Sequence, residues 1–250
     1  MNKEKTIHEF ESFLSHYDLE DSKVLLKKEH TYRVAENCEE IAKALFLSKE
    51  EIDLAWLLGI LHDIGRFEQL KRYHTFKDAE SCNHAFLSAD LLKENYFTLP
   101  NQYQDLIEFC VRWHSAYQIP DCDTLTKKMA FILRDADKID IIRVNVESSF
   151  EDIYGMKESE FYTSTISKEV WDDLMSHQTV YQAHRKTAID FRLSHIAFVF
   201  GLEYKESQIL LAKQGYLNQM LSFESEIDEV NQQWNQLKRE INQYINNSDL

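Results

Sequence analysis

Four histidines and two aspartates stand on the apolar faces of segments with helical periodicity. They are His30, His62, Asp63, His84, His114 and Asp137. His30, for example, lies four residues before Val34, in a stripe that continues through Cys38, Ile41 and Leu45. This spacing is typical of one helix face. Buried polar groups need hydrogen-bond partners or a bound cation, and imidazole and carboxylate groups bind divalent metals. One such residue is usually a hydrogen-bonded core residue, but six together favour a site for one or two divalent ions.

His62 and Asp63 follow the most apolar segment of the chain, IDLAWLLGIL. This segment is apolar on nearly every face, which predicts a helix at the centre of the core. An unpaired carboxylate at a buried helix end is costly, so Asp63 needs a cation nearby. We expect Gly65 to end this helix and to turn the side chain of Arg66 toward the mouth of the site.

The order of these residues in the chain resembles that of a known superfamily. His30, the adjacent pair His62 and Asp63, and then Asp137 follow one another as in the HD-domain superfamily of metal-dependent phosphohydrolases. The local sequences EHTYRVAE, LLGILHDIGRF and LRDADKID are also similar to that superfamily, over about residues 20–150. The resemblance implies an all-α helical bundle.

The resemblance also implies the chemistry of the site. His84 and His114 match the additional histidines of superfamily members with two metal ions. In this interpretation Asp63 bridges two ions, and His84 and His114 bind the second. The first ion is bound by His30, His62, Asp63 and Asp137. Divalent manganese, iron, nickel, cobalt, zinc or magnesium would suit such ligands. A metal-bound hydroxide would then attack a small phosphorylated substrate, such as a nucleotide.

Two alternatives to hydrolysis stay open. HD-type di-iron oxygenases use the same four histidines and two aspartates to bind iron that activates oxygen, and a non-catalytic regulatory module would bind a nucleotide without turnover. The cyclic-dinucleotide phosphodiesterase branch is not favoured. It carries a His-His pair followed by Gly-Tyr-Pro, whereas Trp113 precedes His114 here and no Gly-Tyr-Pro follows.

Basic side chains near the predicted ligands are expected to neutralise charge on a phosphoryl group. Three lie within one helical turn of a predicted ligand: Arg33, Arg66 and Lys138. With Asp63 they form the predicted catalytic set. The segment 66–78, RFEQLKRYHTFKD, is expected to act as a substrate lid or as a plain polar loop. Its predicted substrate-binding residues are Arg66, Lys71, Arg72 and His74.

The composition restricts the fold to helices. Only 5 glycines and 2 prolines occur in 250 residues, too few for the frequent turns of a β-sandwich or barrel. We therefore expect an all-α protein, with an HD-type metal-binding core in residues 1–150 and a helical C-terminal extension in residues 151–250. Helices are expected at 6–17, 20–46, from 48 onward, 83–95, 101–115, 124–147, 167–185, 187–200, 205–221 and 224–246, with 66–82 and 150–164 irregular.

The last expected helix carries apolar residues three and four positions apart, which is a heptad seam. They are Ile227, Val230, Trp234, Leu237, Ile241 and Tyr244. This seam would pack on its own domain or form a homodimer contact.

The net charge restricts the partners. At −15, the protein repels polyanions, so we expect no nucleic-acid polymer as ligand. A small phosphorylated molecule held by local cations is still compatible with this charge. No apolar run reaches the roughly 18 residues of a transmembrane helix, and the start MNKEKTIHEFE does not resemble a signal peptide. We therefore expect a cytoplasmic protein without a membrane partner.

Overall fold

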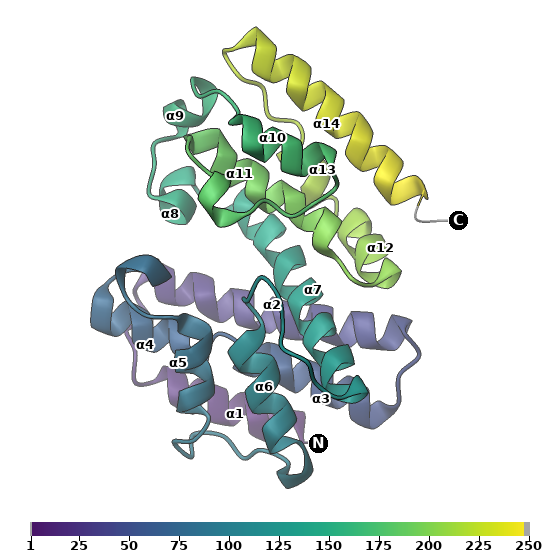
Figure 1. Ribbon diagram of the computed structural model, residues 1–250. Helices are drawn as coiled ribbons and strands as arrows, with labels where there is room; N and C mark the ends of the chain where they lie inside the picture. The colour runs from purple at the N-terminus through teal and green to yellow at the C-terminus, as the bar shows by residue number, and fades with distance from the viewer. Residues whose placement is uncertain (1, 248–250) are drawn as a thin grey trace. The chain divides into compact units, whose positions relative to one another are not determined.

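The computed structural model describes residues 2–247, and every regular element in this range is a helix (Figure 1). The predicted all-α class is thus confirmed. The chain divides into two compact units, Met1–Asp137 and Lys138–Leu250. The division falls within one continuous helix, α7 (Thr124–Glu147). No helix in the described residues combines the length and the apolar character needed to cross a membrane.

The first unit is a helical bundle in which α2 packs on α3, α4 on α5, and α5 on α6. Its helices are α1 (Lys3–Leu14), α2 (Ser22–Ala44), α3 (Lys49–Leu61), α4 (Ile64–Tyr73), α5 (His84–Leu91) and α6 (Gln104–Trp113), followed by the first part of α7; short 3-10 helices lie at Asp78–Glu80 and Asn101–Tyr103.

Helix α3 is the central helix that its apolar sequence predicts. It begins with a capping box, in which Ser48 Oγ accepts a hydrogen bond from the Glu51 N–H at 3.3 Å and the Glu51 carboxylate accepts one from the Ser48 N–H at 3.0 Å. Every residue from 53 to 61 is buried. At Gly59 an added Cβ would lie 2.4 Å from Ala35 Cα, so only glycine allows α2 to approach α3 this closely.

The expected end of this helix at Gly65 is wrong. Helix α3 ends at Leu61 and α4 begins at Ile64, so the break falls on His62 and Asp63. The first eight residues of the segment 66–82, expected to be irregular, continue as helix α4. The amphipathic character of these eight residues suffices for a helix once they pack on the core.

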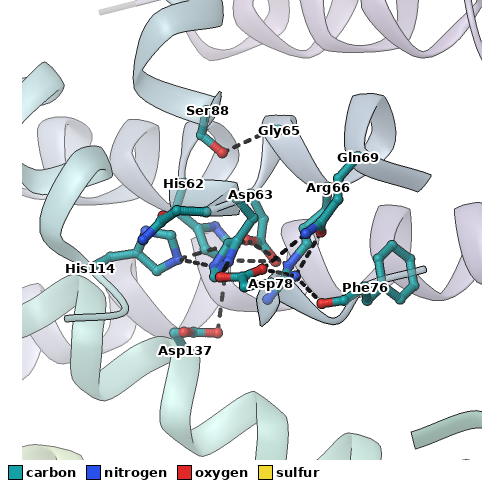
Figure 2. A network of polar contacts seen from close by, with 12 residues as sticks. His62, Asp63, Gly65, Arg66, Gln69, Phe76, Asp78, Ser88, His114 and Asp137 are labelled. Carbon is teal, nitrogen blue, oxygen red and sulfur yellow. Dashed lines mark hydrogen bonds and ion pairs between the residues drawn. The ribbon is translucent and has the colours of Figure 1, made fainter. Parts of the chain in front are cut away.

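Gly65 has a packing role instead. It lies in the first turn of α4, where its N–H donates a hydrogen bond to Ser88 Oγ at 2.9 Å (Figure 2). An added Cβ would lie 2.5 Å from the His84 carbonyl oxygen and 2.6 Å from the Ser88 nitrogen. The missing side chain therefore lets α5, which begins with His84, pack against the start of α4.

The second unit contains the end of α7 and a set of mostly short helices. They are α8 (Phe150–Tyr154), α9 (Glu158–Tyr162), α10 (Lys168–Met175), α11 (Ala188–Ile196), α12 (Lys205–Gln214), α13 (Tyr216–Met220) and α14 (Asp228–Asn247), with 3-10 helices at Gln182–His184 and Ala197–Gly201. The expected loop at 150–164 is therefore partly helical, and Gly155, with φ of 66°, ends α8. The helix expected at 205–221 is broken at Gly215, where φ is 77°. The helix expected at 167–185 stops at Met175.

The apolar seam of the last helix packs within the second unit. Val230, Trp234, Leu237 and Ile241 are buried. The Trp234 indole N–H donates a hydrogen bond to the Leu221 carbonyl at 3.1 Å. A homodimer contact through this seam stays a prediction.

Candidate metal centre

The six predicted ligand residues come together in the first unit from six different elements. His30 lies within α2, His62 caps the C-terminus of α3, and Asp63 precedes α4. His84 begins α5 and His114 follows the last residue of α6. Asp137 reaches the cluster from α7 (Figure 2). Four of the six therefore stand at helix ends, where the backbone turns and can aim the side chain inward.

The two carboxylate oxygens of Asp63 face two different pairs of histidines. Its Oδ2 lies 3.6 Å from the Nε2 atoms of both His30 and His62. Its Oδ1 lies 3.6 Å from the Nε2 atoms of both His84 and His114. Within each pair the two Nε2 atoms are 3.3 Å apart.

Asp137 joins the side of the cluster formed by His30 and His62. Its Oδ1 lies 3.2 Å from His30 Nε2 and 3.8 Å from His62 Nε2. Sets of three ligand atoms lie within 4.8 Å of one another on both sides of Asp63. The arrangement is thus two adjacent half-sites that share one carboxylate, and each could hold a metal ion.

Three of the histidines have their Nδ1 atoms occupied by acceptors. His62 Nδ1 donates to the Gly59 carbonyl at 2.8 Å, and His114 Nδ1 to the Val111 carbonyl at 2.7 Å. His84 Nδ1 donates to Asp78 Oδ2 at 2.7 Å. A neutral imidazole carries one hydrogen, so these bonds leave a lone pair on each Nε2. In the pair of His84 and His114, two such lone pairs face each other, and neither nitrogen can donate to the other.

The buried acceptors around Asp63 Oδ1 are suited to bind a cation, because they lack hydrogen-bond donors. Asp63 Oδ1 is buried and accepts no hydrogen bond from the protein. It lies next to two imidazole lone pairs, so three electron-rich atoms converge without a hydrogen between them. Such a set is unfavourable by itself, because buried acceptors need partners. A divalent cation bound by all three would satisfy them together.

The charge states in the cluster also suit a cation. Burial lowers the pKa of His62 and of His84 to about 4, so both rings are neutral at pH 7. Burial alone would raise the pKa of Asp63, but the neighbouring Lys27 ammonium contributes to holding it well below the ordinary value. Burial acts in the same direction on Asp137, and the hydrogen bond from His30 helps to lower its pKa. Neutral imidazoles and ionised carboxylates are the forms that bind metals.

Two cationic side chains flank Asp63. The Lys27 Nζ donates to Asp63 Oδ2 at 2.7 Å, on the side of His30 and His62. Arg66 Nε lies 3.8 Å from Asp63 Oδ1, is buried, and has no hydrogen-bond acceptor. Both cations also lie near the Phe76 ring, at 5.7 Å and 5.9 Å from its centroid.

A further arginine holds the backbone that carries His114. Arg134, on α7, donates through Nη1 to the carbonyl oxygens of Trp113 at 3.1 Å, His114 at 2.8 Å and Ala116 at 2.6 Å. The Trp113 and His114 carbonyls lie at the end of helix α6, where the last carbonyls have no partner within the helix. Arg134 thus fixes the end of α6, and with it the direction of the His114 ring.

The remaining predicted catalytic and substrate-binding residues have contacts outside the cluster. Arg33 pairs with Glu29 at 3.4 Å. Lys138 donates to the Gly201 carbonyl within the second unit. Lys71 donates to the His16 carbonyl, and Arg72 pairs with Glu68 at 2.6 Å.

His74, the last of the predicted substrate-binding residues, is an exposed residue that follows α4. It has a left-handed backbone with φ of 57°. Among the predicted basic residues, Arg66 has its Nε 3.8 Å from Asp63 Oδ1, so the structure brings this side chain beside Asp63.

Sequence reasoning missed Lys27 and Asp78. Lys27 precedes His30 by three residues on the same helix, so the spacing that linked Arg33 to His30 could have found it. Asp78 lies beyond the end of α4, in a 3-10 turn. No periodic pattern there indicates which way a side chain points.

Comparisons with known proteins agree with this geometry. The family model of the HD domain matches residues 28–142, a range that contains all six cluster residues. No curated protein matches the chain, and no solved structure does. Residues 28–142 thus match the HD-domain family, and the cluster around the histidine–aspartate pair at positions 62 and 63 is consistent with its metal-binding members.

Proposed function

We propose that this protein is a metal-dependent phosphohydrolase that acts on a small phosphorylated substrate. The observation that carries the proposal is the position of Asp63, with one carboxylate oxygen facing each histidine pair. The HD-domain family is largely one of metal-dependent hydrolases. Divalent ions bound in the two half-sites would acidify a coordinated water and neutralise charge on the phosphoryl group.

The side chains of this chain have separate tasks in such a reaction. His62, His84 and His114 present Nε2 because their Nδ1 atoms are held by acceptors. Asp63 and Asp137 supply negative charge that holds the ions. Lys27 and Arg66 add fixed positive charge beside Asp63, where a phosphoryl oxygen would lie. Such preorganised cations stabilise the charge that develops in phosphoryl transfer.

These cations also favour hydrolysis over the oxygenase alternative. A phosphoryl group carries negative charge that Lys27 and Arg66 can neutralise, whereas activation of uncharged oxygen makes no such demand on flanking side chains. Arg66 Nε is a buried donor with no acceptor in the protein, so it is suited to donate a hydrogen bond to an anionic ligand. A regulatory module that only binds nucleotides would not need a complete set of six metal-binding residues.

The test is a reconstitution assay. The protein is stripped with a chelator, reloaded separately with manganese, iron, cobalt, nickel, zinc or magnesium, and assayed for phosphate release from phosphomonoesters, phosphodiesters and nucleotides. We expect metal-dependent release that Asp63→Ala reduces by about three orders of magnitude, because several kcal/mol of charge stabilisation is lost. Asp63→Asn, nearly identical in shape, guards against misfolding of the alanine variant.

Asp90→Asn is the matched control, since Asp90 is an exposed aspartate that pairs with Arg112 at 2.9 Å. It should leave phosphate release unchanged. Oxygen consumption with iron and no phosphate release would contradict the proposal and support the oxygenase. Nucleotide binding without turnover under any metal would support the regulatory module.

The proposal includes two binding partners, a small phosphorylated substrate and a second copy of the chain. A small anionic substrate is compatible with a net charge of −15, because the local cations of the site act at short range while the whole surface repels polyanions. A homodimer contact through the C-terminal helix α14 also stays a prediction, and light scattering of the purified protein would detect the dimer.

A further inference from the structure

Asp78 links two parts of the candidate site that come from different elements. Its Oδ2 accepts the hydrogen bond from His84 Nδ1 at 2.7 Å. Its Oδ1 accepts hydrogen bonds from Arg66 Nη1 at 3.0 Å and from Gln69 Nε2 at 2.9 Å. One carboxylate therefore holds a histidine of the second half-site and, at the same time, the arginine beside Asp63.

The segment after α4 is fastened to that helix through the same residues. Arg66 Nη1 also donates to the Phe76 carbonyl at 2.6 Å and to Gln69 Oε1 at 2.7 Å (Figure 2). Gln69 is fully buried, and its Nε2 also donates to Ser81 Oγ at 2.8 Å and to the Cys82 carbonyl at 3.0 Å. The position of Asp78 is thus fixed by α4 and not by its own short 3-10 turn.

The pattern around Arg66 gives its guanidinium a second role. Its Nη1 donates to three acceptors on α4 and on the following segment, whereas its buried Nε has no acceptor. Arg66 is therefore both a cation beside Asp63 and the anchor of the segment that carries Asp78. Any change at Asp78 would reach His84 and Arg66 together.

We propose that Asp78 is a positioning residue that orients the His84 ring toward the second half-site and holds Arg66 in place beside Asp63. This rests on the proposed metal centre. A hydrogen bond from the far nitrogen of a metal-binding histidine to a carboxylate fixes the ring and its tautomer. Loss of such a partner typically weakens metal binding by 10-fold to 100-fold.

The first measurement is the binding of manganese to chelator-treated protein, monitored by isothermal titration calorimetry. In the wild type we expect two ions per chain. Asp78→Ala should weaken binding of one ion by about 10-fold to 100-fold and leave the other unchanged. Asp78→Asn keeps an oxygen that can accept from His84, so it should recover part of the lost affinity. Asp90→Asn, on α5 as is His84, should bind both ions as the wild type does.

The second measurement does not depend on metal. Nitrogen-15 NMR of the metal-free protein reports which ring nitrogen of His84 carries the hydrogen. We expect hydrogen on Nδ1 in the wild type and in Asp78→Asn, and a mixture of tautomers in Asp78→Ala. Unchanged tautomer and unchanged binding of both ions in Asp78→Ala would overturn the inference. If the wild type binds no metal but Asp78→Ala still changes the His84 tautomer, the proposed function is contradicted and the positioning role of Asp78 is supported.

Discussion

Histidines with a lowered pKa occur in both units, and their surroundings differ. In the second unit, His195 Nδ1 lies 3.0 Å from Asn145 Oδ1 and 3.3 Å from the Tyr154 hydroxyl. These groups offer both donors and acceptors, so the hydrogen bonds of the network can be satisfied within the protein. In the first unit, His84 Nε2 faces His114 Nε2 at 3.3 Å, beside a carboxylate oxygen that accepts no hydrogen bond.

A histidine with a lowered pKa is therefore not by itself the mark of a metal site. Burial, with the charges of Arg185 and Arg192, lowers the pKa of His195 to about 3. Burial lowers the pKa of His84 to about 4. What separates the two regions is the surplus of acceptors in the first unit. A region with surplus acceptors gains a partner when a cation binds, and a balanced network gains none.

The largest expected effect on stability comes from acid. Bound metal should offset this effect in the first unit and not in the second. His62 and His84 titrate near 4 in the folded protein and near 6.5 when unfolded. The unfolded chain therefore binds more protons between these values, and the free energy of unfolding falls as the pH drops from 6.5 to 4. The loss amounts to about 3 kcal/mol at most for each histidine.

His195 should destabilise the second unit in acid for the same reason. Hydrogen-exchange mass spectrometry at pH 5 and pH 7, with and without manganese, distinguishes peptides of α3 from peptides of α11. We expect manganese to restore protection at pH 5 in α3 and not in α11. Equal restoration in both helices would contradict the difference between the two regions.

A smaller effect is expected from breaking the balanced network. Asn145 is buried, and its Oδ1 accepts from both Tyr154 and His195. Asn145→Ala leaves these donors without their acceptor and should lower the free energy of unfolding by about 1–3 kcal/mol. Urea unfolding measures this, with Asn218→Ala, at an exposed position of α13, as the control. Manganese stoichiometry should not change in Asn145→Ala, and a loss of bound metal would show that the second unit contributes to the centre.

The smallest effect concerns the cation beside Asp63. Lys27→Met keeps the length of the side chain and removes the charge that lies 2.7 Å from Asp63 Oδ2. We expect kcat/KM for a phosphorylated substrate to fall about tenfold, because one charged contact to the phosphoryl group is lost. Metal affinity should not fall, since the ammonium competes with an ion for the same oxygen. Lys23→Met, at an exposed position one turn earlier on α2, is the control, and a matching loss of kcat/KM in it would point to a general effect of net charge.

The six cluster residues could be predicted from the sequence because each lies on or beside a periodic apolar stripe. His30 heads the stripe of α2, and Asp137 lies on that of α7. Burial of these stripes forces the polar residues on them into the interior. The all-α class could also be predicted, because the chain has too few glycines and prolines for the turns of a β-fold.

Positions set by contacts between distant segments could not be predicted. Gly65 looks like a helix terminator in the sequence, but its role is set by the backbone of His84 and Ser88, which lies 2.5 Å and 2.6 Å from an added Cβ. Asp78 reaches His84 because Arg66 and Gln69 hold the segment against α4. Local propensity carries no information on such contacts.

The central claim is that the first unit holds two divalent ions that share Asp63. Equilibrium manganese binding to metal-free protein, with the ions counted by inductively coupled plasma mass spectrometry, tests it most directly. We expect two ions per chain in the wild type, one in His30→Ala, one in His84→Ala and none in Asp63→Ala. A wild type that binds no ion, or variants that bind as many ions as the wild type, would contradict it.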